Sequence, residues 1–596
     1  MTPYLILSWR ADDGQASTAA QRIRAEIETT QPRWRVVFDK PGTVIVLGGD
    51  ARALASRIDS HPTFVIGDVF PKTGSGGPVQ NLLSAERPFS DLCATLAEDY
   101  WGAYLAVEVR RHGDVAVFRD PMGMRDGVYW IHSGVHVFAS EAMPWLAVSA
   151  PEQLTVDWQR ISELLLDSAT VAEKTPLSGI ETLPPGTLVD IRAGRTTMRR
   201  LWSPDRFYER GRPAPLDAAT LRNEVLRCVD AWTQTYPNCM IEVSGGLDSA
   251  TVAAAGAATP ARFRHAINFF TDHLSGDERR YARDTCERCH IPLDEVFMPV
   301  GHLGDADLHD IPTGVRPGLS SVTFFHDKLL TRIAIGHGVT ALFTGHGGDS
   351  VFYQHPTAMI AADPSFPRGD IHAYTTLAKW SRESIWTVAS HAFGLPVRSI
   401  RHTENEALAG LPLCGEVRRA ASEWEGEIAD FPPAKRSQIT AIATDRSVIG
   451  PSSRSQALTM LHPLLSQPLV ELAIATDIYR LTEGRQDRAL VRRAFADMLP
   501  ASVIERRGKG VLAQYFGRCL CASVPFLRDF LLDGLLVCND VLDRAELEAM
   551  LDRDFLMRFD CYAKLRSVII TEHWARAWQE RITAMSVNHS ASRAAA

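Results

Sequence analysis

The sequence has no long hydrophobic run and no large excess of one charge. No uninterrupted apolar stretch in its 596 residues reaches the ~18–20 residues that a membrane-spanning helix needs. The first apolar run stops at Arg10, shortly before two aspartates, and this pattern is typical of a strand and not of a signal peptide. We therefore expect a cytoplasmic protein that does not bind membranes.

The charge and the cysteines point to no specialised class of protein. The formal net charge of −8 gives no electrostatic reason to expect nucleic acid as a partner. The ten cysteines are scattered along the chain, which favours reduced thiols over disulfides. Residues 286–290 spell Cys-Glu-Arg-Cys-His, a c-type haem attachment pattern. They continue an amphipathic helix and lack a second ligand cluster, so we expect neither haem nor zinc there.

Length and local pattern divide the chain into two domains. Its 45% hydrophobic and 22% charged residues are ordinary for a globular protein, and 596 residues exceed what one core usually supports. Residues 1–205 contain short β-rich runs between turns and predict a sheet-dominated domain. Residues 203–217, rich in proline, arginine and aspartate, predict a linker. The second domain is expected at residues 206–585, before a disordered tail at residues 586–596.

Strands and helices alternate in the second domain. Apolar strands are predicted at residues 239–243, 263–270 and 339–345, and the first and last of them run into glycine-rich turns. Such alternation predicts a doubly wound parallel sheet, whose ligands bind at the carboxyl ends of the strands. From about residue 365 the pattern is mainly helical. The helix after the second strand carries charges that we expect to be solvated: Glu278, Arg279 and Arg283.

The glycine turn after the first of these strands reads Ser-Gly-Gly-Leu-Asp-Ser. Its glycines allow successive N–H groups, serine hydroxyls and the N-terminus of the next helix to point at one anion, which we predict to be pyrophosphate. The Walker ending Gly-Lys-Ser/Thr is absent here. An aspartate inside an anion-binding loop implies an accompanying cation, so Asp248 is a candidate Mg²⁺ ligand. The predicted binding residues are Ser244, Gly245, Gly246, Leu247, Asp248 and Ser249.

A second glycine-rich turn reads Thr-Gly-His-Gly-Gly-Asp-Ser and covers residues 344–350. Gly345 and Gly347 would allow close approach to a nucleotide, and Asp349 places a second carboxylate at the carboxyl end of a strand. Two carboxylates together with phosphate oxygens suit an octahedral Mg²⁺ site. The two turns therefore predict a Mg²⁺ and nucleotide site held by Asp248 and Asp349.

Together these motifs resemble those of the asparagine synthetase superfamily, in which the first turn is the pyrophosphate loop of the N-type ATP pyrophosphatases. The resemblance spans nearly the whole chain. It implies an α/β protein with an N-terminal class II glutaminase-like domain, of the Ntn type with αββα layers, and a C-terminal ATP pyrophosphatase domain with added helices. Further motifs that carry the resemblance lie at residues 101–104, 118–123, 183–186, 462–465, 492–493, 499–500 and 507–510.

The resemblance also implies cofactors and roles for single residues. ATP and Mg²⁺ are the expected cofactors, and Val243 and Ile267 occupy positions that contact adenine in the family. Lys509 resembles the lysine that stabilises charge at the α-phosphate or on the tetrahedral intermediate. His346 could carry a proton away from the attacking amine or only hydrogen-bond within its loop, and the sequence leaves both roles open.

The first domain departs from the family at its catalytic position. Class II glutaminases use a cysteine at position 2, after removal of Met1, and here position 2 is Thr2. A hydroxyl is a much weaker nucleophile than a thiolate, so we expect no glutaminase activity. The amine is then expected to come from a source other than glutamine.

Three members of the superfamily fit a lost cysteine: ammonia-dependent asparagine synthetases, β-lactam synthetases and lasso peptide cyclases. Asparagine synthetases usually have Gly-Glu-Gly-Ser-Asp-Glu at the second turn, whereas His346 and Ser350 here give a form that looks like that of the cyclases. The other two enzymes remain alternatives, as does a scaffold that binds without catalysis.

The cyclase resemblance implies a macrolactam synthetase for a ribosomally made peptide. Such an enzyme adenylates an Asp or Glu side chain of a precursor peptide, and the peptide's N-terminal amine then closes the ring. The implied partners are the precursor peptide, a leader peptidase and a leader-recognition protein. Residues 316–327 are predicted to line the pocket for the acceptor.

Overall fold

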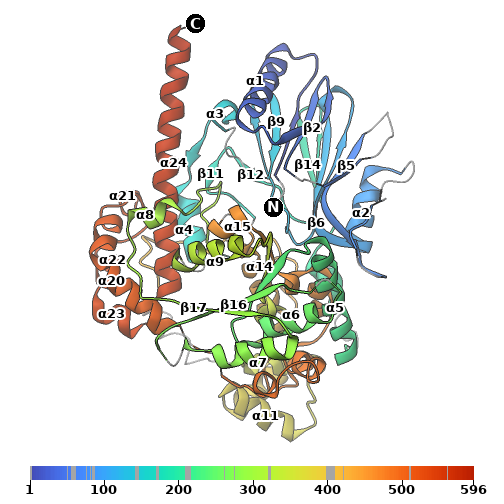
Figure 1. Ribbon diagram of the computed structural model, residues 1–596, viewed down its shortest axis with the longest axis vertical. Helices are drawn as coiled ribbons and strands as arrows, with labels where there is room; N and C mark the ends of the chain where they lie inside the picture. Colours follow the sequence, from blue (N-terminus) through green and yellow to red (C-terminus); the bar gives the residue numbers. More distant parts are fainter. Residues whose placement is uncertain are drawn as a thin grey trace.

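A computed structural model gives the fold of the chain (Figure 1). The first half, in blue, forms one lobe, and the final helix, in red, projects from the second half. The structure describes the chain except residues 1–2, 50–51, 56–61, 75–76, 81, 83–86, 141–145, 169–172, 209–215, 261, 274–275, 320–323, 397–409, 421, 451, 509, 511, 560 and 596.

Two antiparallel sheets make up most of the described part of the first half. The first has the strand order β12 (Glu181–Thr182), β8 (Val128–His132), β9 (Val135–Ala139), β1 (Tyr4–Ser8), β3 (Thr43–Gly48) and β2 (Trp34–Lys40). The second has the order β14 (Arg195–Arg200), β13 (Thr187–Arg192), β7 (Val115–Arg119), β6 (Tyr100–Val109), β5 (Thr63–Pro71) and β4 (Ala53–Ala55). The other elements of this half are the paired strands β10 (Thr155–Val156) and β11 (Leu177–Ser178) and the helices α3 (Leu146–Ser149) and α4 (Trp158–Leu166).

The two sheets face each other, and each outer face is covered by a helix. Every residue of β1 is buried, although successive side chains of a strand point to opposite faces. Tyr4 and Ile6 lie in the core between the sheets, whereas Leu5 and Leu7 lie in the core that contains α1. The layers are therefore helix, sheet, sheet, helix. The outer layers are α1 (Gly14–Thr30) beside the first sheet and α2 (Phe89–Asp99) beside the second.

The second half is built on a parallel sheet. Its strand order is β17 (Leu293–Phe297), β16 (His265–Phe270), β15 (Cys239–Glu242), β18 (Ala341–Phe343) and β19 (Thr459–Leu461). The flanking helices are α5 (Ala218–Thr235), α6 (Leu247–Ala257), α7 (Arg279–Cys289) and α9 (Phe324–Gly336). Ile241 packs in the cluster that contains α6, and its neighbour Met240 packs with Leu330 of α9, so helices cover both faces. This arrangement confirms the predicted α/β fold with a parallel sheet.

The chain reverses its direction across the sheet at β15. After β15 it moves outward through β16 and β17, and it then returns to build β18 and β19 on the other side of β15. The crevice beside such a switch point, at the carboxyl ends of the strands, is where open α/β sheets bind ligands. Both glycine turns, residues 244–249 and 344–350, begin at these ends.

Helices dominate the rest of the second half, as predicted from the sequence. They are α8 (Asp305–His309), α10 (Gly348–Val351), α11 (Ile371–Ser381), α12 (Ile385–Ala392), α14 (Pro433–Asp445), α15 (Ser453–Ala457), α16 (Gln467–Ile474), α17 (Ile478–Thr482), α18 (Ala489–Ala494), α19 (Ala501–Ile504), α20 (Ala513–Leu531), α21 (Leu535–Cys538), α22 (Arg544–Met550), α23 (Arg553–Arg558) and α24 (Tyr562–Ala595). Short 3₁₀ helices are η1 (Arg111–Gly113), η3 (Pro204–Phe207), η5 (Ala358–Ala362), η6 (Arg446–Val448) and η7 (Pro463–Leu465).

Residues 586–595 of the predicted disordered tail form the end of α24. That this tail is disordered stays a prediction.

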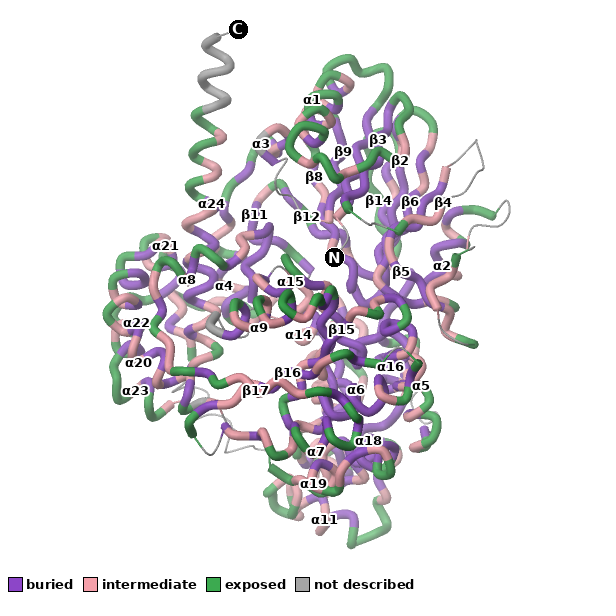
Figure 2. The backbone as a smooth tube through the Cα atoms, viewed as in Figure 1, coloured by how far each residue is buried: buried purple, intermediate pink, exposed green. Residues whose placement is uncertain are grey.

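The two halves share their hydrophobic cores. The ring of Trp232 on α5 lies 4.9 Å from that of Phe70 and 5.7 Å from that of Trp101 in the first half. Lys72 Nζ in turn lies 2.7 Å from Glu471 Oε2 in the second half. Buried residues are found in the sheets of both halves (Figure 2). The predicted division into two units is not accompanied by a gap in packing.

The described part of the predicted linker is packed against the second half. Within residues 203–208, Tyr208 is buried and its hydroxyl donates a hydrogen bond to Asp477 Oδ1 at 2.9 Å. Residues 209–215 lie outside the described chain. The linker itself stays a prediction.

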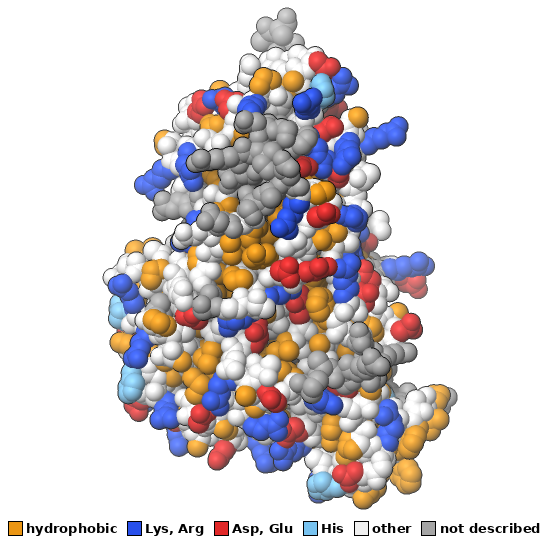
Figure 3. Space-filling model, turned by 90° about the vertical axis from the view of Figure 1, so that its right-hand side faces the viewer, with side chains coloured by type: hydrophobic (Ala, Val, Ile, Leu, Met, Phe, Trp, Pro, Cys, Tyr) orange, Lys and Arg blue, Asp and Glu red, His pale blue; other side chains and the backbone are white. Residues whose placement is uncertain are grey.

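The described surface and helices agree with the absence of long apolar runs. In the part of the chain that the structure describes, no helix combines the length and the apolar character needed to cross a membrane. Acidic and basic side chains are interspersed on the face displayed in Figure 3.

Candidate functional site

The first glycine turn links β15 to the N-terminus of α6. Gly245 has φ +87°, and a Cβ there would lie 2.8 Å from both the Cβ and the backbone oxygen of Glu278. Only glycine adopts this backbone readily in so little space. Gly246 is the N-cap of α6, and its N–H donates to Ser244 Oγ at 3.3 Å. Ser244 Oγ and Ser249 Oγ lie 3.2 Å apart. The turn thus presents hydroxyls and the N-terminal N–H groups of α6 at one point, as an anion site requires.

The second glycine turn lies directly against the first. A Cβ on Gly345 would lie 2.3 Å from the backbone nitrogen of Ser249, and one on Gly348 would lie 2.5 Å from Asp248 Oδ1. Gly347 has φ +89° and caps α10, the helix that carries Asp349. These glycines are therefore needed so that the two turns can touch and their aspartates can share one site.

Arg488 joins the two aspartates, and the sequence did not predict this. Its Nη1 donates to Asp248 Oδ2 and lies 3.8 Å from Asp349 Oδ1, and its Nη2 lies 2.7 Å from Asp487 Oδ2. Burial lowers the pKa of Arg488, but the carboxylates of Asp248, Asp487 and Asp349 outweigh it and raise that pKa. A permanent positive charge therefore lies beside the predicted phosphate site. The only sequence signal was a pair of arginines four residues apart, Arg488 and Arg492, at the start of a helix.

The residues at this point fit a magnesium ion. Asp248 and Asp349 supply carboxylate oxygens, the hard donors that Mg²⁺ prefers, from two turns in contact with each other. Asp349 keeps 38% of its side chain exposed, which leaves solvent access for the waters that Mg²⁺ usually retains.

A cavity of about 590 Å³ opens beside the two turns. Its described lining from the predicted residues comprises Val243, Ser244, Asp248, Ser249, Gly345, His346, Gly347 and Asp349. An adjoining pocket of about 420 Å³ shares Ser244, Asp248 and Asp349 with it. That pocket is also lined by Gly246 and Leu247 and by the basic side chains Arg488, Arg492, Arg506 and Arg507. An anion bound at the residues that the two pockets share would have the arginines of the smaller pocket on one side. On its other side would lie the larger cavity, which polar and apolar side chains line together.

His346 has an acidic partner on the cavity wall. Its Nε2 lies 3.3 Å from the backbone oxygen of Asp445 and 3.6 Å from Asp445 Oδ1, and Asp445 also lines the cavity. Burial raises the pKa of Asp445, while the nearby His346 opposes that rise. His346 also takes part in its own loop, because its backbone N–H donates to Thr344 Oγ1 at 3.2 Å. The geometry is compatible with both roles that the sequence left open.

Another part of the cavity wall holds buried histidines and an arginine. Burial, with smaller contributions from His346 and Arg454, lowers the pKa of His462 to about 3. Burial and Arg454 likewise lower the pKa of His326 to about 3. Arg454 is held between Glu242 Oε2, at 2.8 Å, and Asp327 Oδ1, at 2.6 Å. These histidines are therefore neutral near pH 7, and this wall carries its charge on Arg454 and its two partners.

The predicted acceptor segment reaches the cavity in part. His326 lines the cavity, whereas Asp327 holds Arg454 from behind. Residues 320–323 lie outside the described chain. The described remainder of residues 316–327 thus contributes one lining side chain and one supporting side chain.

Glu278 corrects the expectation of a solvated helix face. It is buried, and its Oε1 accepts hydrogen bonds from Arg506 Nη2 and from the backbone N–H of Gly510. Arg506 Nη1 donates in turn to the backbone oxygen of Gly245 at 3.0 Å, and its guanidinium stacks 3.9 Å from the ring of Tyr281. Helix periodicity did not reveal this because the partners lie more than 200 residues away. Glu278 and Arg506 thus fasten the 506–510 loop to the first glycine turn.

Lys509 and Thr2 lie outside the described residues, so their predicted roles stay predictions. The neighbours of Lys509 do reach the site: Gly510 lines the cavity and Gly508 lines the adjoining pocket.

Ile267 does not line the cavity. It is fully buried with Met240, Leu330 and Leu342 in the core beneath α9. Phe269, two residues farther along the same strand, lines the cavity in its place. Gly245 lines neither pocket and supports the turn from behind, where its oxygen accepts from Arg506. The adenine contact of Ile267 stays a prediction.

The two cysteines of the haem-like pattern lie in the core. Cys286 and Cys289 are buried on α7, and burial raises the pKa of Cys286 to about 12 and that of Cys289 to about 11. Protonated, buried thiols are poor ligands and nucleophiles.

Converging glycine turns, paired carboxylates and a basic pocket at the carboxyl edge of a parallel sheet define a nucleotide-using α/β enzyme. The family model described as asparagine synthase matches residues 220–576, more than half of the chain. The chain therefore belongs to the asparagine synthase family, and it is an ATP-dependent, amide-forming ligase.

Comparisons beyond the family model add little. No curated protein matches the chain. An allosteric regulatory enzyme of purine biosynthesis is 11% identical, covers 51% of this chain and 76% of its own, and has a TM-score of 0.21. Glutamine phosphoribosylpyrophosphate amidotransferase from B. subtilis, complexed with ADP and GMP, is 10% identical and has a TM-score of 0.21. The match covers 66% of this chain and 92% of that one. The U34-tRNA thiolase from Methanococcus maripaludis is 12% identical and has a TM-score of 0.18. The match covers 38% of this chain and 78% of that one.

Proposed function

We propose that the chain is a lasso peptide macrolactam synthetase. It adenylates an Asp or Glu side-chain carboxylate of a precursor core peptide, and the N-terminal amine of the same peptide displaces AMP to close the ring. The products are the macrolactam, AMP and pyrophosphate.

The observation that carries this proposal is the pairing of His346 with Asp445 beside the two glycine turns. In the family, this position of the second turn usually holds an acidic residue in asparagine synthetases, and the histidine form resembles the cyclases. A neutral imidazole supported by a carboxylate is a general base suited to an amine nucleophile.

In the first step a carboxylate oxygen of the peptide attacks the α-phosphorus of ATP, and pyrophosphate leaves. Asp248 and Asp349 would hold Mg²⁺, which supplies positive charge to the phosphates when bound. The N-terminus of α6 and the basic pocket favour the leaving pyrophosphate, because they present N–H groups and guanidinium groups to it. The described cations of that pocket are Arg488, Arg492, Arg506 and Arg507.

In the second step the amine attacks the acyl carbon, and AMP leaves as the amide forms. His346 accepts the proton that the amine loses, and Asp445 stabilises the resulting imidazolium. Lys509 is proposed to stabilise charge at the α-phosphate or on the tetrahedral intermediate. The loop that carries it is held by Glu278 and Arg506.

The first half, residues 1–205, is proposed to be a glutaminase-like domain that has lost its nucleophile. Thr2 stands where that class has cysteine, and the peptide's own amine makes released ammonia unnecessary. The proposed partners are the precursor peptide, a leader peptidase and a leader-recognition protein in the cytoplasm. The adenylating domain is proposed to cover residues 206–585.

The test is mass spectrometry of reactions with ATP, Mg²⁺ and one of three substrates. These are a leader-free core peptide, aspartate with ammonia, and a carboxyethyl-arginine-like amino acid. Loss of one water from the peptide, with AMP and pyrophosphate released, is expected. Turnover of a small molecule alone would instead assign the chain to the asparagine or β-lactam synthetases.

A variant separates the two steps of the proposed reaction. His346→Ala is expected to form the acyl-adenylate, detected as exchange of labelled pyrophosphate into ATP, but to close the ring at least ~10²-fold more slowly. Equal loss of exchange and cyclisation would contradict the base role of His346 and would mean that this residue is needed for adenylation itself.

A further inference from the structure

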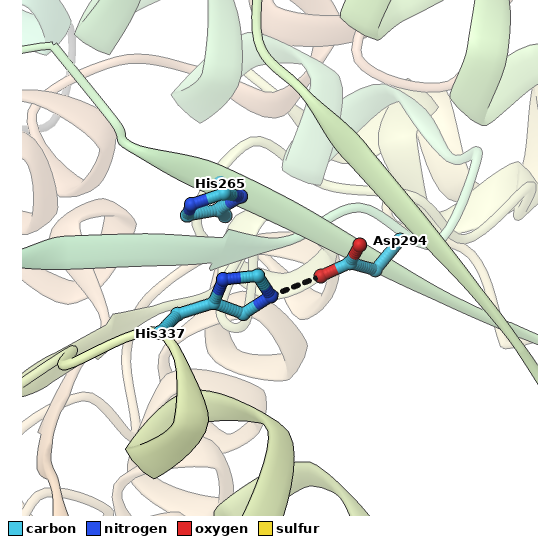
Figure 4. A group of neighbouring side chains, drawn as sticks. All are labelled: His265, Asp294 and His337. Carbon is cyan, nitrogen blue, oxygen red and sulfur yellow. Dashed lines mark hydrogen bonds and ion pairs between the residues drawn. The ribbon is translucent and has the colours of Figure 1, made fainter.

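A group of metal-ligating side chains lies at the edge of the parallel sheet opposite the cavity. His265 is the first residue of β16, Asp294 is the second residue of β17, and His337 directly follows α9 (Figure 4). The glycine turns follow β15 and β18 at the carboxyl edge of this parallel sheet, so this group at the amino edge belongs to a separate place in the fold.

The three side chains converge. His337 Nε2 lies 2.7 Å from Asp294 Oδ2, and the ring of His265 stacks on that of His337 with centroids 3.8 Å apart and planes at 28°. One ligand atom from each residue lies within 4.8 Å of the other two. In Figure 4 the two rings lie one above the other with the carboxylate to one side. Among the described residues, this is the group whose ligand atoms come this close.

We propose that His265, Asp294 and His337 form a zinc site. Two imidazole nitrogens and a carboxylate oxygen are a common three-ligand set for Zn²⁺, with water as the fourth ligand. Ca²⁺ and Mg²⁺ prefer all-oxygen ligands and do not suit two imidazoles. The site is independent of the proposed ligase reaction.

To form the site, the stacked rings of His265 and His337 turn until a nitrogen of each points at one ion. Ligands about 2.0–2.1 Å from a tetrahedral Zn²⁺ lie roughly 3.3 Å from one another. The contact between His337 and Asp294 therefore opens slightly, and His265 moves closer. All three side chains are only partly buried, so they have room to turn and the ion has a path from solvent.

The ion would tie together β16, β17 and the connection from α9 to β18, beside the core formed by Met240 and Leu330.

The experiment uses the full-length protein after treatment with a chelator. Co²⁺ is titrated in as a spectroscopic substitute, and Zn²⁺ affinity is then measured by competition with a chromophoric chelator. The wild type is expected to take up one equivalent, with the visible d–d absorption of a tetrahedral ion and without thiolate charge-transfer bands. Zn²⁺ is also expected to raise the melting temperature.

Variants assign the site. His337→Asn and Asp294→Asn are each expected to weaken Zn²⁺ binding by at least ~10- to 100-fold, the loss that even an outer partner of a ligand causes. His372→Asn, an exposed histidine on α11, is the matched control and should change nothing. If His337→Asn does not fold, the more conservative Asp294→Asn decides.

Three results would overturn the proposal. These are absence of binding at micromolar Zn²⁺ in the wild type, equal binding by the wild type and Asp294→Asn, and loss of binding in His346→Asn, which would place the ion in the cavity.

Discussion

The two halves of the chain use glycine and sheet structure for different ends. In the first half, Gly113 has φ +80°, and a Cβ there would lie 1.7 Å from the backbone oxygen of Trp9, so this glycine lets two segments pack. In the second half, Gly345 and Gly348 let two turns touch at the open edge of a parallel sheet, and the contact brings Asp248 and Asp349 together. The same residue type stabilises a fold in one half and forms a site in the other.

The largest difference between the two halves is expected when a buried carboxylate is removed from each: activity should be lost in one case and thermal stability in the other. Asp248→Asn is expected to lower formation of AMP and pyrophosphate by roughly 10³-fold, because a group beside developing phosphate charge is lost. Asp120 of the first half accepts backbone N–H bonds from Met124 and Arg125, both at 2.9 Å. Asp120→Asn is expected to lower the melting temperature while turnover per folded molecule stays the same. An active Asp248→Asn enzyme would remove that carboxylate from the site.

Replacing one glycine by alanine in each half should affect ATP binding in the second half and only thermal stability in the first. Gly345→Ala is expected to weaken ATP binding by about 10²-fold, because displacing a site by 1 Å can have that effect. Gly102 of β6 has φ +137°, and its Cβ would lie 2.2 Å from the oxygen of Asp68. Gly102→Ala should lower the melting temperature and leave the Kd for ATP unchanged. Calorimetry and thermal unfolding measure the two effects, and equal loss of ATP affinity in both variants would contradict the contrast.

Acid should destabilise the second half through His462. Its folded pKa of about 3 lies below its unfolded value near 6.5, so the unfolded chain binds the extra proton in between. The stability is fully present above pH 6.5 and is lost as the pH falls toward 3, by roughly 2 kcal/mol at pH 5. His462→Gln should reduce this loss in urea unfolding at pH 7 and pH 5. Burial also lowers the pKa of His136 in the first half, so His136→Gln gives the comparison. If His462→Gln lost as much unfolding free energy between pH 7 and pH 5 as the wild type, His462 would not be the source of the acid sensitivity.

The smallest effect is expected where a side chain positions another segment. Glu278→Gln removes the charge that holds Arg506 but keeps the acceptor for Gly510, so kcat should fall about 10-fold with little change in KM for ATP. Arg279→Gln, the next residue along the chain, is the matched control because it pairs locally with Asp277. A Glu278→Gln effect on KM alone would mean that the loop contributes to binding and not to chemistry.

Local pattern predicted the parts of the site that are local. The two glycine turns, the strands before them and the helices after them follow from short stretches of sequence, and the structure brings their aspartates together. Arg488 and Glu278 were missed as site residues because each meets its partner across more than 200 residues of chain. The adenine contact of Ile267 was expected from the family resemblance alone, and the structure places this residue in the core beneath α9.

The packing of Trp232 against Phe70 and Trp101 has a consequence for how the chain can be shortened or can evolve. A protein that began at α5 would expose this aromatic surface, and the helix that leads into the ligase sheet would lose its support. The first half would then be retained as part of the scaffold of the second, whatever chemistry it performs or has lost. Packing against a neighbouring domain is therefore enough reason for a domain to be retained, even without a reaction of its own.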